Sequence, residues 1–243
     1  MTALLQVKDL TKRFGGVTAV DRCSFTVEAG SITALIGPNG SGETTVFNLV
    51  TGYLPADAGE VWFDGIEMRR PHPAKLYRKG LSRTFQQARV FGELSVLENL
   101  VVAAGHGWRD MFCARVSTGD RKRARELLSE FGLAQHADLP AAKLSYGQRK
   151  LLEFAAVMMS RPKLVLLDEP TAGVNPVLIE TMEHHIRARH AAGTTFLIVE
   201  HDMALVMRLC SPVVVLDRGA PIMTGPPAEV QQDPLVLDAY LGA

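Results

Sequence analysis

The residues with the clearest chemistry form a glycine-rich loop between residues 37 and 45. Glycine tolerates positive φ and has no Cβ, so this spacing lets backbone N–H groups wrap closely round phosphate oxygens. An apolar, strand-like run (Ile32–Ile36) precedes the loop, and a helix-compatible run (45–50) follows it. The N-terminus of such a helix favours an anion, so the loop predicts a phosphate site. Its candidate phosphate-binding residues are Gly37, Pro38, Asn39, Gly40, Ser41, Gly42, Glu43, Thr44 and Thr45.

One position departs from the pattern G-x-x-x-x-G-K-S/T. Glu43 stands where the pattern has lysine, whose ammonium group meets the terminal phosphates, and the loop contains no other lysine. Two unit charges about 4 Å apart interact by about 4 kcal/mol at an effective dielectric constant near 20, and the exchange turns attraction into repulsion. We therefore expect nucleotide affinity or transition-state stabilisation at this loop to fall by roughly 2–5 kcal/mol.

An acidic pair follows an apolar strand-like run over residues 163–167. Asp168 at the end of such a strand is placed to hold Mg²⁺ by way of water, with the Thr44 hydroxyl as another ligand. Glu169 comes next and can polarise an attacking water. A phosphate loop alone also fits a kinase, a GTPase or a motor, but the loop and the acidic pair together predict a site for nucleotide hydrolysis.

Strand-like and helix-like segments alternate along the rest of the chain. The early strands indicate a β-rich lobe, and the strand over 59–65 ends in the turn pair Asp64-Gly65. From 95 to about 130 apolar residues recur at helical spacing. Strands alternating with helices predict a parallel α/β sheet, whose ligands lie at the carboxyl ends of its strands. The other expected strands cover 5–10, 24–27 and 196–199, the last ending in Glu200-His201.

Composition sets limits on the class of protein. Of the 243 residues, Lys plus Arg and Asp plus Glu number 26 each, so overall charge gives no support to a nucleic-acid partner. The three cysteines (Cys23, Cys113 and Cys210) are scattered, which fits a reducing compartment. No apolar run approaches the roughly 18 residues that cross a bilayer. We expect contact with a membrane only through another chain.

Three further features have simpler interpretations. The basic run over 121–125 is expected to be a solvated helix face rather than a nucleic-acid patch. His184, His185 and His190 lack the i, i+4 spacing of helical metal ligands and are expected to be exposed. Trp62 and Trp108 are expected to be packing residues rather than parts of a functional site.

The motif that separates the remaining possibilities is Leu144-Ser145-Tyr146-Gly147-Gln148. It lies before a helical run over 149–160, so Ser145 is a candidate N-cap and the Gly147 N–H lies at a helix N-terminus, where an anion binds. With Asp168-Glu169-Pro170 after it, the pair resembles the signature motif and Walker B motif of ABC-type ATPases. The resemblance covers essentially the whole chain.

The resemblance implies a P-loop α/β fold with a parallel-sheet core, an antiparallel N-terminal β lobe and an inserted helical subdomain at roughly 88–160. The whole of 1–243 is then one ABC ATPase domain that binds ATP and Mg²⁺. It implies that Phe14 stacks on adenine, that Gln86 contacts Mg²⁺ and the attacking water, and that His201 contacts the γ-phosphate. Residues 172–175 resemble the D-loop.

In its finer features the chain resembles the ATP-binding subunits of branched-chain amino-acid importers. Urea importers have ATP-binding subunits that are closely related to these. Those features are Tyr146 in place of the first glycine of LSGGQ, Arg83-Thr84-Phe85-Gln86, Gly173-Val174-Asn175-Pro176, Glu200-His201-Asp202-Met203 and Ala239-Tyr240-Leu241-Gly242. The resemblance implies a subunit on the cytoplasmic face of the membrane, held there by transmembrane permease subunits. It also implies a head-to-tail dimer with a second ATPase subunit, in which Ser145, Gly147 and Gln148 complete the nucleotide site of the partner's loop.

Three functions stay open at this point. The first is an ATPase subunit energising an importer, weakened at its own loop by Glu43. The second is a catalytically silent regulatory or structural subunit of a heterodimer, which Glu43 favours and the intact Glu169 and His201 oppose. The third is a soluble, non-transport ABC ATPase. The sequence does not separate a natural Glu43 from an introduced one.

Overall fold

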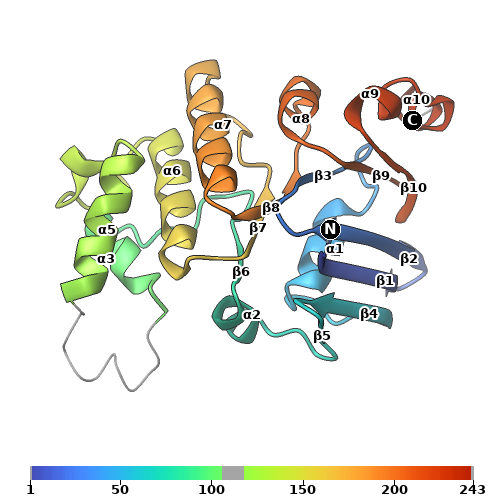
Figure 1. The fold of residues 1–243 in the computed structure, drawn as a ribbon, viewed down its shortest axis with the longest axis horizontal. Helices are drawn as coiled ribbons and strands as arrows, with labels where there is room; N and C mark the ends of the chain where they lie inside the picture. Colours follow the sequence, from blue (N-terminus) through green and yellow to red (C-terminus); the bar gives the residue numbers. More distant parts are fainter. Residues whose placement is uncertain (1, 106–117, 242–243) are drawn as a thin grey trace.

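Two β-sheets organise the computed structural model, which describes residues 2–105 and 118–241 (Figure 1). The smaller sheet has four strands in the order β2-β1-β4-β5, and every pair is antiparallel. Its strands are β1 (Ala3–Phe14), β2 (Val17–Glu28), β4 (Ala58–Phe63) and β5 (Ile66–Glu67). This sheet is the β-rich lobe that the early strands predict.

The larger sheet has six strands in the order β10-β9-β3-β8-β7-β6. Neighbours from β9 to β6 run parallel, and β10 pairs antiparallel with β9. Its strands are β3 (Ile32–Ile36), β6 (Leu81–Arg83), β7 (Leu164–Asp168), β8 (Thr195–Val199), β9 (Val213–Asp217) and β10 (Ala220–Gly225). Since β3, β8 and β7 are adjacent, the loops that follow them leave the same edge of the sheet.

Every residue of β3, β7 and β8 is buried, because both faces of the larger sheet are covered. Successive side chains point to opposite faces, so Ile36 joins one hydrophobic core while Leu35 joins the other. One core contains apolar residues of the helices between residues 96 and 209, and the other lies between the two sheets and contains those of the helix that follows the glycine-rich loop.

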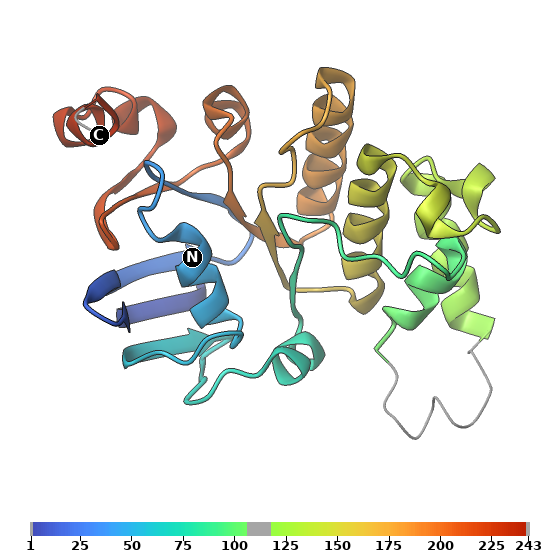
Figure 2. The same cartoon turned by 180° about the vertical axis from the view of Figure 1, so that it is seen from behind.

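Figures 1 and 2 show α3, α5 and α6 at one end of the molecule and the C-terminal helices α9 and α10 at the other. No helix within the described ranges is long and apolar enough to cross a membrane. The helices are α1 (Glu43–Val50), α2 (Pro73–Lys79), α3 (Val96–Val102), α5 (Thr118–Glu130), α6 (Tyr146–Val157), α7 (Pro176–Ala191), α8 (Met203–Leu209), α9 (Pro227–Val230) and α10 (Pro234–Leu241), with short 3-10 turns at Ala134–His136, Ala141–Lys143 and Met158–Ser160.

Two strands are longer than the sequence predicts. The alternation of side chains indicates strands over 5–10 and 24–27, whereas β1 and β2 each span 12 residues. Asp9 and Arg22 have positive φ, and the β1–β2 pairing shifts register between Val7 and Leu10. Such bulges interrupt the alternation, and the pattern therefore shows only part of each strand.

The prediction that the histidines of α7 are exposed is wrong for His185. Its ring is buried and stacks on Phe131 with 4.2 Å between centroids. Burial lowers the pKa of His185 to about 4, so the ring is neutral at physiological pH. His184 is exposed as expected, while His190 is half-buried and donates from Nε2 to the Gly30 carbonyl at 2.9 Å.

Three further predictions concern the basic run, the tryptophans and the cysteines. The basic run over 121–125 lies on α5 and is mostly exposed, which confirms a solvated face. Trp62 is half-buried, with the Lys8 ammonium 5.3 Å from its ring centroid. Cys23 and Cys210 are buried free thiols. Trp108, Cys113 and positions 106–117 of the expected helical stretch lie outside the described residues.

Candidate functional site

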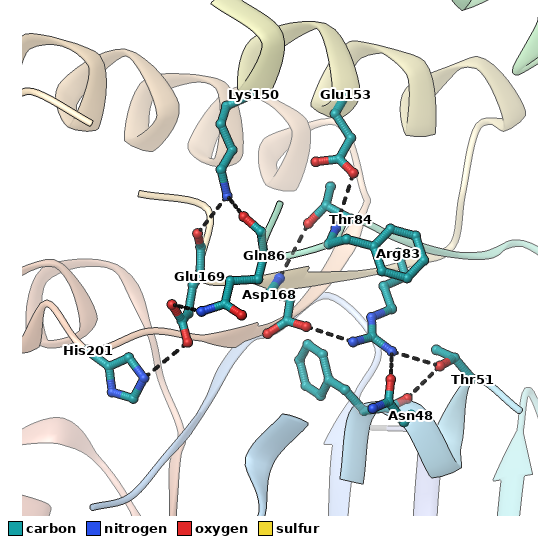
Figure 3. A network of polar contacts seen from close by, with 12 residues as sticks. Asn48, Thr51, Arg83, Thr84, Gln86, Lys150, Glu153, Asp168, Glu169 and His201 are labelled. Atoms are coloured by element: carbon teal, nitrogen blue, oxygen red, sulfur yellow. Dashed lines mark hydrogen bonds and ion pairs between the residues drawn. The ribbon is translucent and has the colours of Figure 1, made fainter. Parts of the chain in front are cut away.

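The loops after β3, β7 and β8 place three of the predicted polar clusters at one edge of the larger sheet. The loop after β3 is the glycine-rich loop, β7 delivers Asp168 and Glu169, and β8 delivers Glu200 and His201. Figure 3 shows Asp168, Glu169 and His201 close together. The sequence prediction of a shared edge is therefore confirmed.

The glycine-rich loop leaves no room for side chains at two of its glycines. A Cβ on Gly37 would lie 2.3 Å from the Leu216 carbonyl oxygen, and one on Gly42 would lie 2.5 Å from that of Ala19. Gly42 has φ of 106° and is the N-cap of α1, with no side-chain cap. The first N–H groups of α1 are therefore not satisfied by a capping side chain, and they are available to an anion.

Glu43 is buried at the start of α1, with only 6% of its surface exposed. Its Oε1 accepts a hydrogen bond from the Ser41 hydroxyl at 2.8 Å. Burial above all raises the pKa of Glu43 to about 7, and the carboxylates of Glu169 and Asp168 raise it further, against the lowering effects of Ser41 and His201. Near neutral pH this side chain is therefore divided between its neutral and charged forms.

Glu169 lies between two polar side chains, one on each carboxylate oxygen (Figure 3). Gln86 donates from Nε2 to Oε2 at 3.0 Å, and His201 Nε2 lies 3.3 Å from Oε1. The structure thus joins the three predicted catalytic residues directly, from segments 83 and 32 residues apart. Gln86, rather than its neighbour Gln87, is the glutamine that reaches the site.

Asp168 is buried and has its two oxygens in different states. Oδ2 accepts from Arg83 Nη2 at 2.6 Å, while Oδ1 is buried without a hydrogen-bond partner among the described residues. A carboxylate oxygen without a partner in the described part of the chain fits a magnesium site, since Mg²⁺ takes few protein ligands and keeps several waters. The predicted second ligand, Thr44, is exposed. No group of three His, Cys, Asp or Glu within 2–105 and 118–241 offers a denser metal cage.

Two buried charges on α6 hold the loop that carries Gln86. Lys150 Nζ donates to the carbonyl oxygens of Gln86 at 2.6 Å and of Glu169 at 3.0 Å. Glu153 Oε1 accepts from the N–H groups of Phe85 and Arg89, each at 3.2 Å. Burial lowers the pKa of Lys150 and raises that of Glu153 to about 7. Together they fasten this loop to α6.

Ser145 begins α6 as an N-cap with a full capping box. Its hydroxyl accepts from the Gln148 N–H at 3.2 Å, and the Gln148 side chain accepts from the Ser145 N–H at 2.9 Å. A Cβ on Gly147 would lie 2.2 Å from Leu178 Cδ2, so a side chain at this position would require Leu178 to move. In both views α7, β7 and β8 separate α6 from α1, so the structure does not bring Ser145, Gly147 and Gln148 to the phosphate loop of their own chain (Figures 1 and 2).

Phe14 ends β1 with 47% of its surface exposed, and the Lys12 ammonium lies 5.5 Å from its ring centroid. The next strand, β2, brings the Ala19 carbonyl against Gly42. The exposed ring thus belongs to the hairpin that borders the phosphate loop.

The family model for ABC transporters matches residues 20–172, which span the phosphate loop, Gln86, Ser145 and Glu169. The chain belongs to the ABC transporter family. A second model, for the branched-chain amino acid ATP-binding cassette transporter, matches residues 220–243 of this ABC ATPase.

Relatives and solved structures agree over the full length of this ABC ATPase. The chain is 39% identical to the high-affinity branched-chain amino acid transport ATP-binding protein BraF of Pseudomonas aeruginosa, covering 98% of each. It is 39% identical to the probable branched-chain amino acid transport ATP-binding protein LivG of Archaeoglobus fulgidus, covering 99% of this chain and 96% of that protein. Crystal structures of a nucleotide-free ATP-binding cassette and of one in its ADP conformation each match with a TM-score of 0.89, at 34% identity over 100% of both chains. The fold class predicted from the sequence is confirmed.

Three buried residues of this ABC ATPase were not predicted: Lys150, Glu153 and Glu200. Lys150 and Glu153 interrupt the apolar run of α6, which is the signal that could have marked them. Glu200 accepts from the Thr171 N–H at 2.9 Å and from the His201 N–H at 3.0 Å. It thereby joins the strand end that carries His201 to the turn after Glu169.

Proposed function

We propose that this chain is the ATP-binding subunit that energises an importer of branched-chain amino acids. The observation that carries the proposal is the Glu169 carboxylate, which Gln86 and His201 contact beside the phosphate loop. The substrate class rests on the names of the relatives and on the match over residues 220–243. In this proposal residues 1–243 form one ABC domain, with a helical subdomain at roughly 88–160.

Each site residue has a role in ATP hydrolysis. The loop from Gly37 to Thr45 holds the phosphates, and Glu169 polarises the attacking water as general base. His201 contacts the γ-phosphate, and Gln86 orients the water and contacts the metal. Thr44 and Asp168 would hold Mg²⁺, which when bound would neutralise the negative charge of the phosphate groups. The exposed ring of Phe14 stacks on adenine.

The separation of α6 from α1 supports a head-to-tail dimer (Figure 1). Ser145 and Gly147 are not buried, and the Ser145 hydroxyl keeps its proton to donate while its oxygen accepts from Gln148. We infer that they and Gln148 complete a site on the phosphate loop of a second ATPase subunit. Permease subunits hold the pair on the cytoplasmic face of the membrane.

Glu43 favours a second candidate function, a silent regulatory subunit. A buried carboxylate at the phosphate loop opposes the binding of the terminal phosphates. The complex would then hydrolyse ATP only where this chain's Ser145 meets the partner's loop.

The test is transport by the complex isolated from membranes with its permease and second ATPase subunit. We expect ATP-dependent uptake of labelled leucine, isoleucine or valine into proteoliposomes, and none when this chain is omitted. Uptake of urea instead would overturn the substrate class. Unchanged uptake after Glu169→Gln in this chain, with Glu126→Gln as control, would support the silent subunit.

The affinity of the chain for ATP should depend on pH through Glu43. The carboxyl group has a pKa of about 7 in the free protein, and bound phosphate favours its neutral form. Raising the pH from about 6 to about 8 therefore weakens binding by up to about tenfold, the effect of one proton taken up on binding. Glu43→Gln has no such proton. Its Kd therefore shows how binding changes with pH through the protonation of ATP alone, which is the control.

The measurement is the ratio of the two Kd values, wild type to Glu43→Gln, by calorimetry at several pH values. A ratio that stays constant across pH 7 contradicts a charged Glu43 facing the phosphates.

The same raised pKa determines how the stability of the folded chain changes with pH. Because the folded pKa lies above 4.5, the contribution of Glu43 is fully present below pH 4.5 and is lost as the pH rises through 7.

A further inference from the structure

Arg83 is a buried cation at the end of β6 that no role in hydrolysis yet accounts for. Its side chain is 5% exposed, and that of its partner Asp168 is 3% exposed. The two residues lie on neighbouring parallel strands, where Arg83 pairs with Leu166 of β7. Asp168 is the carboxylate proposed to hold the metal, so Arg83 contacts a proposed metal ligand directly.

The guanidinium uses its two terminal nitrogens in different directions (Figure 3). Nη2 donates to Asp168 Oδ2 at 2.6 Å. Nη1 donates to Asn48 Oδ1 at 2.7 Å and to Thr51 Oγ1 at 3.1 Å. Asn48 and Thr51 lie at the C-terminal end of α1, the helix whose N-terminus forms the phosphate loop. Arg83 therefore links that helix to Asp168.

Aromatic rings form the remaining surroundings of the cation. The guanidinium carbon lies 5.5 Å from the ring centroid of Phe47, 5.8 Å from that of Tyr53 and 5.0 Å from that of Phe85. Arg83 Nε is buried and has no hydrogen-bond partner among the described residues. Within this cage the planar fork has little freedom to turn, so it directs its donors to fixed positions.

A buried ion pair of this kind adds little net stability compared with apolar residues of similar volume. Its effect is instead geometric. With Oδ2 engaged by Arg83, the Asp168 carboxylate cannot rotate freely, and Oδ1 is the oxygen left without a partner among the described residues. A lysine at position 83 carries the same charge on one nitrogen, which cannot span Asp168 and Asn48 as the fork does.

We propose that Arg83 is a positioning residue that fixes the Asp168 carboxylate with one oxygen left for Mg²⁺ and joins it to the C-terminal end of α1. The inference rests on the proposed function, because it assigns Asp168 to the metal. A partner of a metal ligand typically changes metal affinity by about 10–100-fold when it is replaced.

The test measures ATP affinity with Mg²⁺ and with EDTA, in the wild-type chain and in the Glu43→Lys background, where binding is expected to be tight. We expect Mg²⁺ to strengthen binding, and we expect Arg83→Lys to reduce that gain by at least about tenfold. Affinity in EDTA should change by less than about threefold, since Arg83 does not belong to the phosphate loop. Arg89→Lys is the matched control, because Arg89 lies 3.6 Å from the same Phe85 ring on the exposed side.

The outcomes distinguish a failure of the role proposed for Arg83 from a failure of the proposed magnesium site. An Arg83→Lys variant that keeps the full gain from Mg²⁺, even with a lower melting temperature, overturns the inference and leaves a structural role. Arg83→Met, which also removes the charge, should reduce the gain in ATP affinity from Mg²⁺ at least as strongly. If this variant keeps the full gain, the inference is overturned as well. A Glu43→Lys background without any gain from Mg²⁺ overturns both the magnesium site and the role of Arg83.

Discussion

Glu43→Lys is expected to raise the affinity of this chain for ATP by between about 30-fold and a few thousand-fold, the equivalent of roughly 2–5 kcal/mol. The variant replaces a buried carboxylate at the N-terminus of α1 with an ammonium group. It removes the hydrogen bond from Ser41 and the repulsion that Glu43 shares with Asp168 and Glu169. The site then holds one negative charge fewer and one positive charge more, close to where the terminal phosphates bind.

The measurement is calorimetric binding of Mg-ATP to the wild type, Glu43→Gln and Glu43→Lys. Glu43→Gln removes the repulsion without adding an attraction, so its affinity should lie between the other two. Glu126→Lys is the control for net charge, because it makes the same change on the exposed surface of α5. Equal affinities for the wild type and Glu43→Gln would show that protonation of Glu43 already relieves the repulsion. Equal affinities for all four proteins would contradict the expected attraction between the introduced lysine and the phosphates as well.

Turnover is the second large effect, because it depends on Glu169. In the Glu43→Lys background, assembled with the second ATPase subunit, Glu169→Gln should lower ATP hydrolysis at this chain's loop by about 10²–10⁴-fold, the usual contribution of a general base. ATP affinity should change little, because an amide of the same shape can still contact Gln86 and His201.

Single-turnover hydrolysis of labelled ATP measures this step, in a complex whose second ATPase subunit carries an inactivating substitution at its own site. His201→Ala should also slow hydrolysis, since it removes the contact that His201 makes with Glu169. Glu126→Gln, on α5, should have no effect. If Glu169→Gln hydrolyses ATP at the full rate while His201→Ala does not, Glu169 is not the base and His201 takes the leading role.

The sequence by itself determined the features that depend on neighbours along the chain. The spacing of the glycines predicted the phosphate loop, and the apolar runs before Gly37 and Asp168 predicted buried strands that end at the site. Ser145, placed directly before a helical run, predicted the N-cap of α6. Loop conformation, helix capping and strand periodicity are set within a few residues, so one stretch of sequence is enough to show them.

Only the tertiary structure decided which distant side chains meet. Arg83 pairs with Asp168 across 85 positions, and Lys150 reaches Gln86 across 64. The burial of Glu43, which raises its pKa to about 7, and the stacking of His185 on Phe131 likewise depend on chain segments that fold over them. A charged or aromatic side chain looks the same in sequence whether water or protein surrounds it, and the cost of removing it from water depends on partners that only the fold supplies.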